Sequence, residues 1–374
     1  MTTRLPNQAA AIRDVFARLG AGEITLPFIQ PADPFLDMAG EDLRRRIFLT
    51  ESETGESLCL RPEFTIPVCL YHIAARAATP HRYAYLGEVF RQRRDGANEF
   101  FQAGIEDLGD PDLTAADARS LADALATLAV AVPGRTLVTT MGDQAVFEAV
   151  LAALGLPRGW QQRLARAFGA PDMLKQALAD LAAGGKAEIS DDQAAALVAA
   201  SDGAGLLAHV EATMAATGIS PSAGRSPAEI AARLIEKAQL ESTRLSTEAM
   251  AALERFLAID VPLAKADAAL QDFAEGAGLR IGRALETFSG RIAAIGNLGL
   301  DLDAIRYDAA FGRPLDYYTG LVYEITVDGA DKPLAGGGRY DRLLTLLGAE
   351  KTIPGVGFSL WLDRAEAAAM GGRA

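Results

Sequence analysis

The sequence has few of the residues that build disulfides and metal sites, since 374 residues include only two cysteines and three histidines. Cys59 and Cys69 are ten positions apart in apolar surroundings, and the histidines show no spacing typical of metal ligands. We therefore expect two buried free thiols and no metal ion. Free thiols are typical of a reducing compartment, which predicts a cytoplasmic protein.

Long apolar runs and an excess of positive charge are also missing. No apolar run reaches about 18 residues and no charged N-terminal segment precedes an apolar one, so we expect neither a membrane span nor a signal peptide. The 36 basic side chains are outnumbered by 49 acidic ones, which gives a net charge of -13. An electrostatic field of this sign opposes the binding of nucleic acid, which is also negatively charged, and we expect no nucleic-acid partner.

The distribution of residues along the chain indicates one sheet domain interrupted by helices. Half of the residues are hydrophobic, and the length exceeds what a single core usually supports. Residues 143–298 are rich in alanine and leucine and have almost no β-branched alternation, whereas strand patterns occur on both sides. We predict an α+β fold in which residues 1–140 and 300–374 form one domain and residues 141–299 are a helical insertion.

Several local patterns support this division. Apolar residues at helical spacing predict a helix over residues 8–19, and the two prolines of residues 23–31 favour an edge or interface strand. Residues 48–60 are typical of a hairpin. Residues 321–328 alternate between two sets of side chains, one of them mostly polar, which predicts a half-buried strand.

An antiparallel hairpin is predicted for residues 82–109, in which two alternating runs are joined by the turn signal Asp95-Gly96. Gln102, Gly104 and Glu106 share one face of the second run. An amide, a missing side chain and a carboxylate in a row suit the floor of a site for a small polar ligand, with room left at Gly104. The alternative is a solvated outer face with the glycine at a bulge.

A second segment passes from strand into helix. It covers residues 60–77 and begins LRPEFT, with Thr65 as the expected N-cap residue. Glu63 therefore lies beside a helix N-terminus. It is either a ligand-binding carboxylate or a partner of the helix dipole.

A third segment carries aromatic and cationic side chains. Residues 312–324, GRPLDYYTGLVYE, bring Arg313, Tyr317 and Tyr318 together. Ring contacts, hydroxyl donors and a guanidinium suit an amino acid with a polar aromatic side chain, although a tyrosine pair in a strand also serves core packing. Residues 335–341, AGGGRYD, bring bare backbone alongside, with a spacing that does not match a nucleotide-binding glycine loop.

These segments resemble the catalytic domain of class II aminoacyl-tRNA synthetases, and specifically histidyl-tRNA synthetase. LRPEFT is similar to that family's LRPEGT segment, and YLGEVFRQRR with FFQAGIED is similar to its second class motif. GRPLDYYTGLVYE resembles its histidine-specific motif, and GGGRYD with GVGFSLWLDR resembles its third motif. The likeness covers residues 8–140 and about 300–366, and it implies an antiparallel sheet flanked by helices.

The resemblance also implies a site for free histidine. In that family the positions of Glu63 and Thr65 hold the α-amino group. Those of Gln102 and Arg313 lie at the amino and carboxylate end, and those of Glu106 and Tyr318 contact the imidazole. This division is chemically sound, because an ammonium needs acceptors, a carboxylate needs a guanidinium, and an imidazole needs an acceptor and a hydroxyl. The histidine-binding residues expected here are Glu63, Thr65, Gln102, Glu106, Arg313, Tyr317 and Tyr318.

The departures from the synthetases fall where their ATP lies. The glycine of LRPEGT is Phe64 here, the hairpin loop is about three residues shorter and lacks a phosphate-binding arginine, and a glycine of the third motif is Trp361. An indole at that place fills much of the adenosine space and buries apolar area worth roughly 2 to 3 kcal/mol. Arg91 and Arg364 resemble the ATP-contacting arginines, so with Trp361 they are interpreted as a vestigial nucleotide site. Their alternative role is to pair with neighbouring acids.

The sequence ends soon after the third motif, and we expect the anticodon-binding domain of the synthetases to be absent. In these respects the chain is similar to the regulatory subunits of ATP phosphoribosyltransferase. The resemblance implies a non-catalytic protein without a cofactor, which dimerises and joins a short-form catalytic subunit in a hetero-oligomer inhibited by histidine. Two alternatives remain: an enzyme that activates histidine with ATP, and a histidine-sensing module with another partner.

Overall fold

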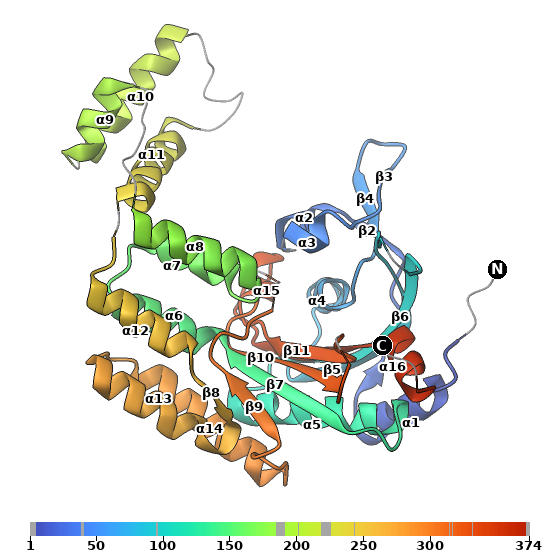
Figure 1. Cartoon of the computed structure of the whole chain (residues 1–374). Coiled ribbons are helices and arrows are strands. Elements are labelled where there is room, and N and C mark those ends of the chain that lie inside the picture. Colours follow the sequence, from blue (N-terminus) through green and yellow to red (C-terminus); the bar gives the residue numbers. More distant parts are fainter. Residues whose placement is uncertain are drawn as a thin grey trace.

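The computed structural model describes residues 5–38, 41–94, 96–184, 191–200, 202–217, 226–242, 244–313, 315, 317–330 and 332–371. In these residues nine strands form one sheet with the order β1-β5-β6-β12-β11-β10-β7-β9-β8 (Figure 1). Its strands are β1 (Gly22–Glu23), β5 (His81–Phe90), β6 (Glu99–Leu108), β7 (Leu137–Asp143), β8 (Asp260–Pro262), β9 (Ile305–Asp308), β10 (Leu321–Val327), β11 (Ala335–Arg339) and β12 (Gly355–Trp361).

The sheet is mixed rather than antiparallel, which corrects the sequence-based expectation. β1 pairs with β5 in parallel and β7 pairs with β9 in parallel, whereas the other neighbouring strands are antiparallel. Parallel neighbours require a long connection, and the chain between β7 and β9 includes the whole helical region. The motifs that predicted the sheet lie in its central strands and carried no information about these short outer strands.

The predicted hairpin of residues 82–109 is confirmed as β5 and β6, which pair from His81 with Leu108 to Phe90 with Glu99. Asp95 of the expected turn lies outside the described residues. β10 is more buried than a half-buried strand, because it lies between β11 and β7 and Val322 on its second face is also buried.

A second, smaller sheet has the order β2-β4-β3 in the described residues. β3 (Leu49–Glu51) and β4 (Ser57–Leu60) form the hairpin expected for residues 48–60. β2 (Ile29–Pro31) lies at the edge, as its proline predicts. Three large apolar side chains of this region are about half exposed, namely Phe28, Ile29 and Leu49.

Helices cover both faces of the large sheet and give it two cores. On one face, Leu121 and Leu128 of α5 pack in one apolar cluster with Ala103 of β6. On the other face, Val68 and Cys69 of α4 join a second cluster. Cys59 belongs to this second cluster, and both thiols are free and buried, as predicted. The helices that accompany the sheets are α1 (Ala9–Arg18), α2 (Asp33–Met38), α3 (Glu41–Arg44), α4 (Thr65–Ala74), α5 (Leu113–Ala131), α15 (Leu343–Leu346) and α16 (Leu362–Ala369).

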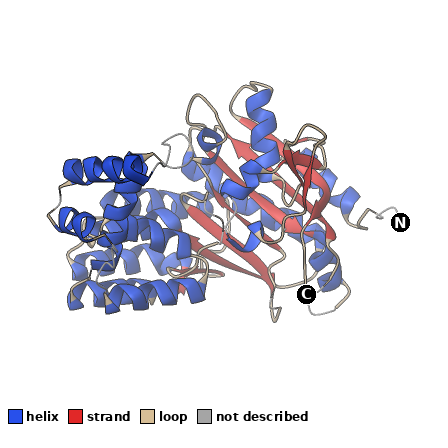
Figure 2. Ribbon diagram, turned by 90° about the horizontal axis from the view of Figure 1, so that it is seen from above, coloured by secondary structure: helices blue, strands red, loops and turns tan. Residues whose placement is uncertain are grey.

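The remaining helices lie beside one end of the large sheet (Figure 2). Helices α6 and α12 to α14 contribute side chains to the first core, so this part of the helical region is packed on the sheet. α9, α10 and α11 surround a small core of their own and project outward (Figure 1). The helices are α6 (Gln144–Ala153), α7 (Arg158–Ala167), α8 (Pro171–Ala183), α9 (Asp192–Ala199), α10 (Gly203–Thr217), α11 (Pro227–Ser242), α12 (Thr247–Leu257), α13 (Leu263–Ala277) and α14 (Gly282–Asn297).

A buried ionic network joins the helical region to the sheet. Arg291 of α14 donates to Asp117 of α5 at 2.7 Å and to Asp143. Asp143 is the N-cap of α6, and its other carboxylate oxygen accepts the backbone N–H groups of the first turn. Arg339 of β11 donates to the second oxygen of Asp117 at 2.7 Å. Buried charges of this kind need every partner, so the network fixes how these elements meet.

Two kinds of feature are missing from the part of the chain that the structure describes. None of its helices combines the length and the apolar character needed to cross a bilayer. Its His, Cys, Asp and Glu side chains form no group of three that could hold a metal ion.

Candidate functional site

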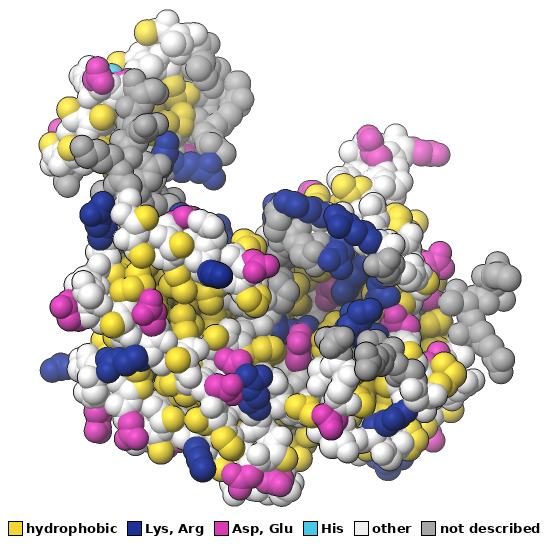
Figure 3. Space-filling model, in the orientation of Figure 1, with side chains coloured by type: hydrophobic (Ala, Val, Ile, Leu, Met, Phe, Trp, Pro, Cys, Tyr) yellow, Lys and Arg dark blue, Asp and Glu magenta, His cyan; other side chains and the backbone are white. Residues whose placement is uncertain are grey.

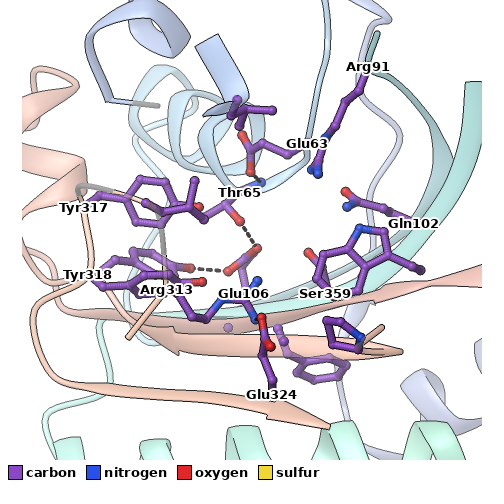
Figure 4. Close-up of a pocket in the computed structure, with 18 of the residues that line it drawn as sticks. Glu63, Thr65, Arg91, Gln102, Glu106, Arg313, Tyr317, Tyr318, Glu324 and Ser359 are labelled. Carbon is purple, nitrogen blue, oxygen red and sulfur yellow. Dashed lines mark hydrogen bonds and ion pairs between the residues drawn. The ribbon is translucent and has the colours of Figure 1, made fainter. Parts of the chain in front are cut away.

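The floor of a cavity is formed where β6 pairs with β12 (Figure 4). Gln102 of β6 lies opposite Trp361 of β12, and Glu106 lies opposite Gly357. Because alternate residues of a strand point to the same side, Gln102 and Glu106 face the cavity together with Ser359. The shared face predicted for Gln102 and Glu106 is therefore present, and it is buried rather than solvated.

The glycines of this floor are covered by the protein's own side chains. A Cβ atom at Gly104 would lie 2.7 Å from Cζ of Tyr85, and one at Gly357 would lie 2.7 Å from the carboxyl carbon of Glu106. The expectation that Gly104 leaves room for a ligand is therefore wrong, because Tyr85 fills that space. A sequence reveals that a side chain is missing but not which neighbour takes its place.

Phe64 supports the tyrosine that covers Gly104. The rings of Phe64 and Tyr85 are stacked, with centroids 4.3 Å apart and planes inclined by 10°. The guanidinium of Arg61 lies 4.2 Å from the centre of the Phe64 ring, and its Nε donates to the backbone oxygen of Glu88. Phe64 thus belongs to the second core.

The carboxylate of Glu63 caps the first turn of α4. It accepts hydrogen bonds from the backbone N–H groups of Thr65 at 2.6 Å and Ile66 at 2.9 Å. Thr65 is the first residue of the helix and not the expected N-cap, because the helix begins one residue earlier, with Phe64 at the N-cap position. The N–H of Val68, which a Thr65 cap would bind, is donated to the backbone oxygen of Phe64 at 2.9 Å. The Thr65 hydroxyl donates instead to Oε1 of Glu106 at 2.7 Å. Burial raises the pKa of Glu63 in spite of its hydrogen bonds.

Glu106 is enclosed by hydroxyl groups. Its carboxylate accepts hydrogen bonds from Thr65 at 2.7 Å, from Tyr85 at 3.4 Å and from Tyr340. Burial raises its pKa to about 8, although these hydroxyls favour the ionised form. At neutral pH the group is therefore mostly protonated, and it can donate a hydrogen bond as well as accept one.

Arg313 enters the cavity from the segment between β9 and β10. Its Nη1 donates to the backbone oxygen of Tyr323 at 3.2 Å and lies 3.5 Å from Oε1 of Glu324. Its guanidinium covers Gly336, where a Cβ atom would lie 2.8 Å from Nη2. The Nε of Arg313 is buried and meets no hydrogen-bond acceptor among the described residues. A buried N–H group in this state suits a carboxylate of a ligand.

Tyr317 and Tyr318 lie across the cavity from Gln102 and Ser359, with Glu106 between them (Figure 4). The two tyrosine ring centroids are 5.1 Å apart, and both rings are buried in the second core. Burial raises the pKa of Tyr318 to about 12, so its hydroxyl stays protonated. Core packing and a place on the cavity wall are therefore compatible roles for this pair.

Trp361 closes one end of the cavity. Only 6% of its surface is exposed, and the guanidinium of Arg364 lies 4.5 Å from the centre of its ring. With the amide of Gln102 oriented to satisfy its neighbours, the amide oxygen accepts the indole N–H at 3.2 Å and Nη2 of Arg91 at 3.2 Å. The indole is therefore held inside the protein by a hydrogen bond and by stacking.

The two arginines beside the indole each donate a hydrogen bond to a backbone oxygen. Nε of Arg91 donates to the backbone oxygen of Pro62 at 2.7 Å, and burial lowers the pKa of Arg91 to about 10 while Glu63 opposes this change. Nη1 of Arg364 donates to the backbone oxygen of Pro333 at 2.7 Å. The carboxylate of the neighbouring Asp363 is bound by Arg93 at 2.8 Å.

The cavity has a volume of about 330 Å³, which lies within the range of small-molecule sites. Leu43 and Arg46 contribute to its lining from the side of α3, where Lys and Arg side chains gather on the surface (Figure 3). The structure brings all ten residues predicted from the sequence to its walls: Glu63, Thr65, Arg91, Gln102, Glu106, Arg313, Tyr317, Tyr318, Trp361 and Arg364.

Sequence reasoning missed five polar residues of the cavity, namely Arg46, Glu324, Lys332, Tyr340 and Ser359. Alternation was the signal available for Glu324, Tyr340 and Ser359. Tyr340 follows β11 directly and lies an even number of residues from Gly336, so it has the same orientation. Glu324 of β10 pairs with Gly336. Ser359 lies two residues from Trp361 and therefore on the same face of β12.

The comparisons with known proteins first define the class of fold. The family model for histidyl-tRNA synthetase matches residues 2–223 and 228–365. A Bacillus halodurans structure, described as an ATP phosphoribosyltransferase regulatory subunit/histidyl-tRNA synthetase, is similar with a TM-score of 0.66 and 20% identity over 97% of this chain and 78% of that one. A Nostoc histidyl-tRNA synthetase is similar with a TM-score of 0.65 and 17% identity over 97% and 71%. The chain therefore has the histidyl-tRNA synthetase fold of class II.

The sequence relatives identify the family within this class. The chain is 65% identical over 367 residues to the ATP phosphoribosyltransferase regulatory subunit of Mesorhizobium japonicum. The matched region covers 98% of both proteins. It is 63% identical over 364 residues to the protein of the same name from a Chelativorans species, which covers 97% of this chain and 98% of the relative. The chain belongs to the family of ATP phosphoribosyltransferase regulatory subunits.

Proposed function

We propose that this chain is the non-catalytic regulatory subunit that a short-form ATP phosphoribosyltransferase catalytic subunit needs for activity and for feedback inhibition by histidine. The near full-length identity of 65% to a protein of that name supports this role. The catalytic subunit condenses ATP with phosphoribosyl pyrophosphate in the first step of histidine biosynthesis. This chain contributes no catalytic residue and works in the cytoplasm.

Histidine is the ligand that we assign to the cavity on β6. The observation that carries this assignment is that two buried carboxyl groups, Glu63 and Glu106, share one cavity with the guanidinium of Arg313. Glu63 and Thr65 offer oxygen acceptors to the ammonium, and Arg313 with Gln102 binds the amino and carboxylate end.

The imidazole is assigned to the part of the cavity between Glu106 and Tyr318. Glu106 and Tyr318 bind its two nitrogens, and the ring of Tyr317 covers it. Glu106 is able to match either state of an imidazole nitrogen, since its raised pKa allows it to donate or to accept.

We assign no ATP binding to this chain. Arg91, Trp361 and Arg364 form what we take to be a vestigial nucleotide site, in which the indole occupies the place of the adenosine. Three contacts of Trp361 support this view: its hydrogen bond to Gln102, its stacking on Arg364 and its position 5.7 Å from the guanidinium of Arg313.

Self-association and domain organisation belong to the same proposal. The half-exposed side chains of Phe28, Ile29 and Leu49 support a dimer, because a cluster of exposed apolar groups is typical of an interface. We also propose that residues 1–140 and 300–374 form one domain and that residues 141–299 are inserted into it.

Two measurements test the proposed function. Calorimetric titration of the purified chain with histidine is expected to give saturable binding, and titration with ATP is expected to give none. Mixing with a short-form catalytic subunit is expected to produce pyrophosphate from ATP and phosphoribosyl pyrophosphate, with inhibition by histidine. No stimulation of the catalytic subunit would contradict the regulatory role.

The second candidate function is activation of histidine with ATP. Retention of both Arg91 and Arg364 in the cavity favours it. Histidine-dependent exchange of pyrophosphate into ATP by the purified chain distinguishes the two, since we expect no exchange.

A further inference from the structure

The helical region touches the ligand-binding segment at one very close contact. Phe168 and Gly169 connect α7 to α8, and they lie directly against Gly312 and Arg313. Arg313 is one of the arginines that line the cavity, so this contact reaches the site itself.

No side chain separates the two backbones at this point. A Cβ atom at Gly312 would lie 2.5 Å from Cδ1 of Phe168 and 2.7 Å from the nitrogen of Gly169. A Cβ atom at Gly169 would lie 2.5 Å from the carbonyl carbon of Gly312 and 2.6 Å from that of Arg313. Non-bonded atoms do not approach so closely, and Gly169 also has a φ of 96°, so both positions need glycine.

The contact is transmitted along the segment that carries the aromatic residues of the site. The backbone nitrogen of Leu315 donates to the oxygen of Arg313 at 2.8 Å, and the nitrogen of Tyr318 donates to the oxygen of Leu315 at 3.5 Å. A displacement of Arg313 therefore moves Tyr318 as well. Tyr318 lies across the cavity from Gln102 (Figure 4).

A column of aromatic rings packs against the turn formed by Phe168 and Gly169. The Phe168 ring is stacked on Phe147 of α6 with centroids 4.2 Å apart. Phe147 lies 6.2 Å from Phe256 of α12, which lies 5.5 Å from Phe273 of α13. Rigid packed side chains of this kind transmit displacements, because a close-packed interior has little room to absorb them.

We propose that Phe168 and Gly169 are positioning residues of the cavity, through which the helical region sets the place of Arg313 and Tyr318. A protein that binds to α6, α12 or α13 and shifts this column would change the affinity for histidine, and histidine would change the affinity for that protein by the same factor. The proposal rests on the assignment of histidine to the cavity.

The test compares two glycine substitutions in the full-length chain. Gly169→Ala adds a methyl group at the contact. Gly155→Ala is the matched control, because Gly155 also has a positive φ, 74°, and a Cβ atom there meets nothing within 4 Å. Calorimetric titration is expected to show histidine binding about tenfold weaker in Gly169→Ala, a loss of about 1.4 kcal/mol. Gly155→Ala should stay within about twofold of the wild type.

A spectroscopic measurement makes the test independent of histidine binding. The chain has two tryptophans, so Trp160→Phe leaves Trp361 as the sole emitter. Because its ring lies 5.7 Å from the guanidinium of Arg313, its emission should shift when Gly169→Ala displaces that residue. Gly155→Ala should leave the emission unchanged.

The outcomes separate the two proposals. If the wild type does not bind histidine but Gly169→Ala alone shifts the emission of Trp361, the positioning role holds and the ligand assignment fails. If both alanine variants match each other in affinity and emission, the positioning role is overturned. Should Gly169→Ala not fold, Phe168→Leu replaces it, with histidine binding expected to be about threefold weaker because the stacking on Phe147 is lost. An unchanged affinity and emission in Phe168→Leu would then overturn the proposal.

Discussion

The hydroxyl of Thr65 donates a 2.7 Å hydrogen bond to Oε1 of Glu106, which joins the first turn of α4 to the middle of β6. Glu63 caps the same turn, since its carboxylate accepts the backbone N–H groups of Thr65 and Ile66. In the proposed complex Thr65 contacts the ammonium of histidine and Glu106 contacts the imidazole. The groups assigned to the ammonium and to the imidazole are therefore joined by one hydrogen bond before any ligand binds.

Replacement of Glu106 by alanine is expected to weaken histidine binding in the calorimeter by about 10- to 150-fold. Loss of a hydrogen bond to a charged or strongly polar group costs about 1.5 to 3 kcal/mol, and a binding constant falls tenfold for about each 1.4 kcal/mol. Glu254→Ala on the exposed face of α12 is the control for a lost carboxylate. Unchanged affinity in Glu106→Ala would place the ligand elsewhere.

The pH dependence of stability should report the same carboxyl group. Its pKa is about 8 in the folded protein and about 4.5 when unfolded, so between these values the folded state holds a proton that the unfolded state has released. The free energy of unfolding is therefore expected to fall as pH rises from about 5 to 8.

Glu106→Gln provides the comparison, because an amide does not titrate while Glu63 remains in both proteins. Urea midpoints measured at pH 5, 6, 7 and 8 should fall more steeply in the wild type than in Glu106→Gln. Parallel curves would mean that Glu106 is already ionised at pH 5.

Removal of the indole of Trp361 should cost stability and open the nucleotide space. Truncation of a buried tryptophan to alanine costs about 3 to 5 kcal/mol. If the indole is what excludes adenosine, Trp361→Ala gains measurable ATP binding. Trp160→Ala, at a tryptophan buried in α7, should lose similar stability without that gain. Tight binding of ATP to the wild type would contradict the assignment of a vestigial site.

The buried network at Arg291 should be far more sensitive than an exposed ion pair. Arg291→Met leaves Asp117 and Asp143 buried without their shared partner, at a cost of about 3 to 5 kcal/mol. Arg306→Met removes an ion pair with Asp260 in which both side chains are about half exposed, and it should cost less than about 1 kcal/mol. Chemical denaturation of the two variants measures the difference. Equal losses would show that the network contributes little.

Much of the site was predictable because it lies on alternating strands. Alternation along β6 placed Gln102 and Glu106 on one face, and the motif likeness brought Arg313 from more than 200 positions away to the same cavity. The role of Gly104 was not predictable from the sequence. Whether a ligand or Tyr85 fills the space beside this glycine depends on packing between strands, which the local sequence pattern does not contain.

The outer parts of the fold were predictable to a smaller extent. The helical character of residues 143–298 followed from composition, but the division of its side chains between the sheet's core and the separate core of α9 to α11 did not. β1 and β9 have two and four residues, too few for a periodic pattern to reveal that they pair in parallel.

The separate core of α9 to α11 has a consequence for how the protein can evolve. Its buried apolar side chains among the described residues are Ala194, Leu206, Val210, Met214 and Ala231, a small set compared with the aromatic column beside the sheet. A unit with so few contacts opens locally at low free energy while the rest stays folded. We therefore expect substitutions that fit this unit to a new neighbour to leave the chemistry of the cavity unchanged.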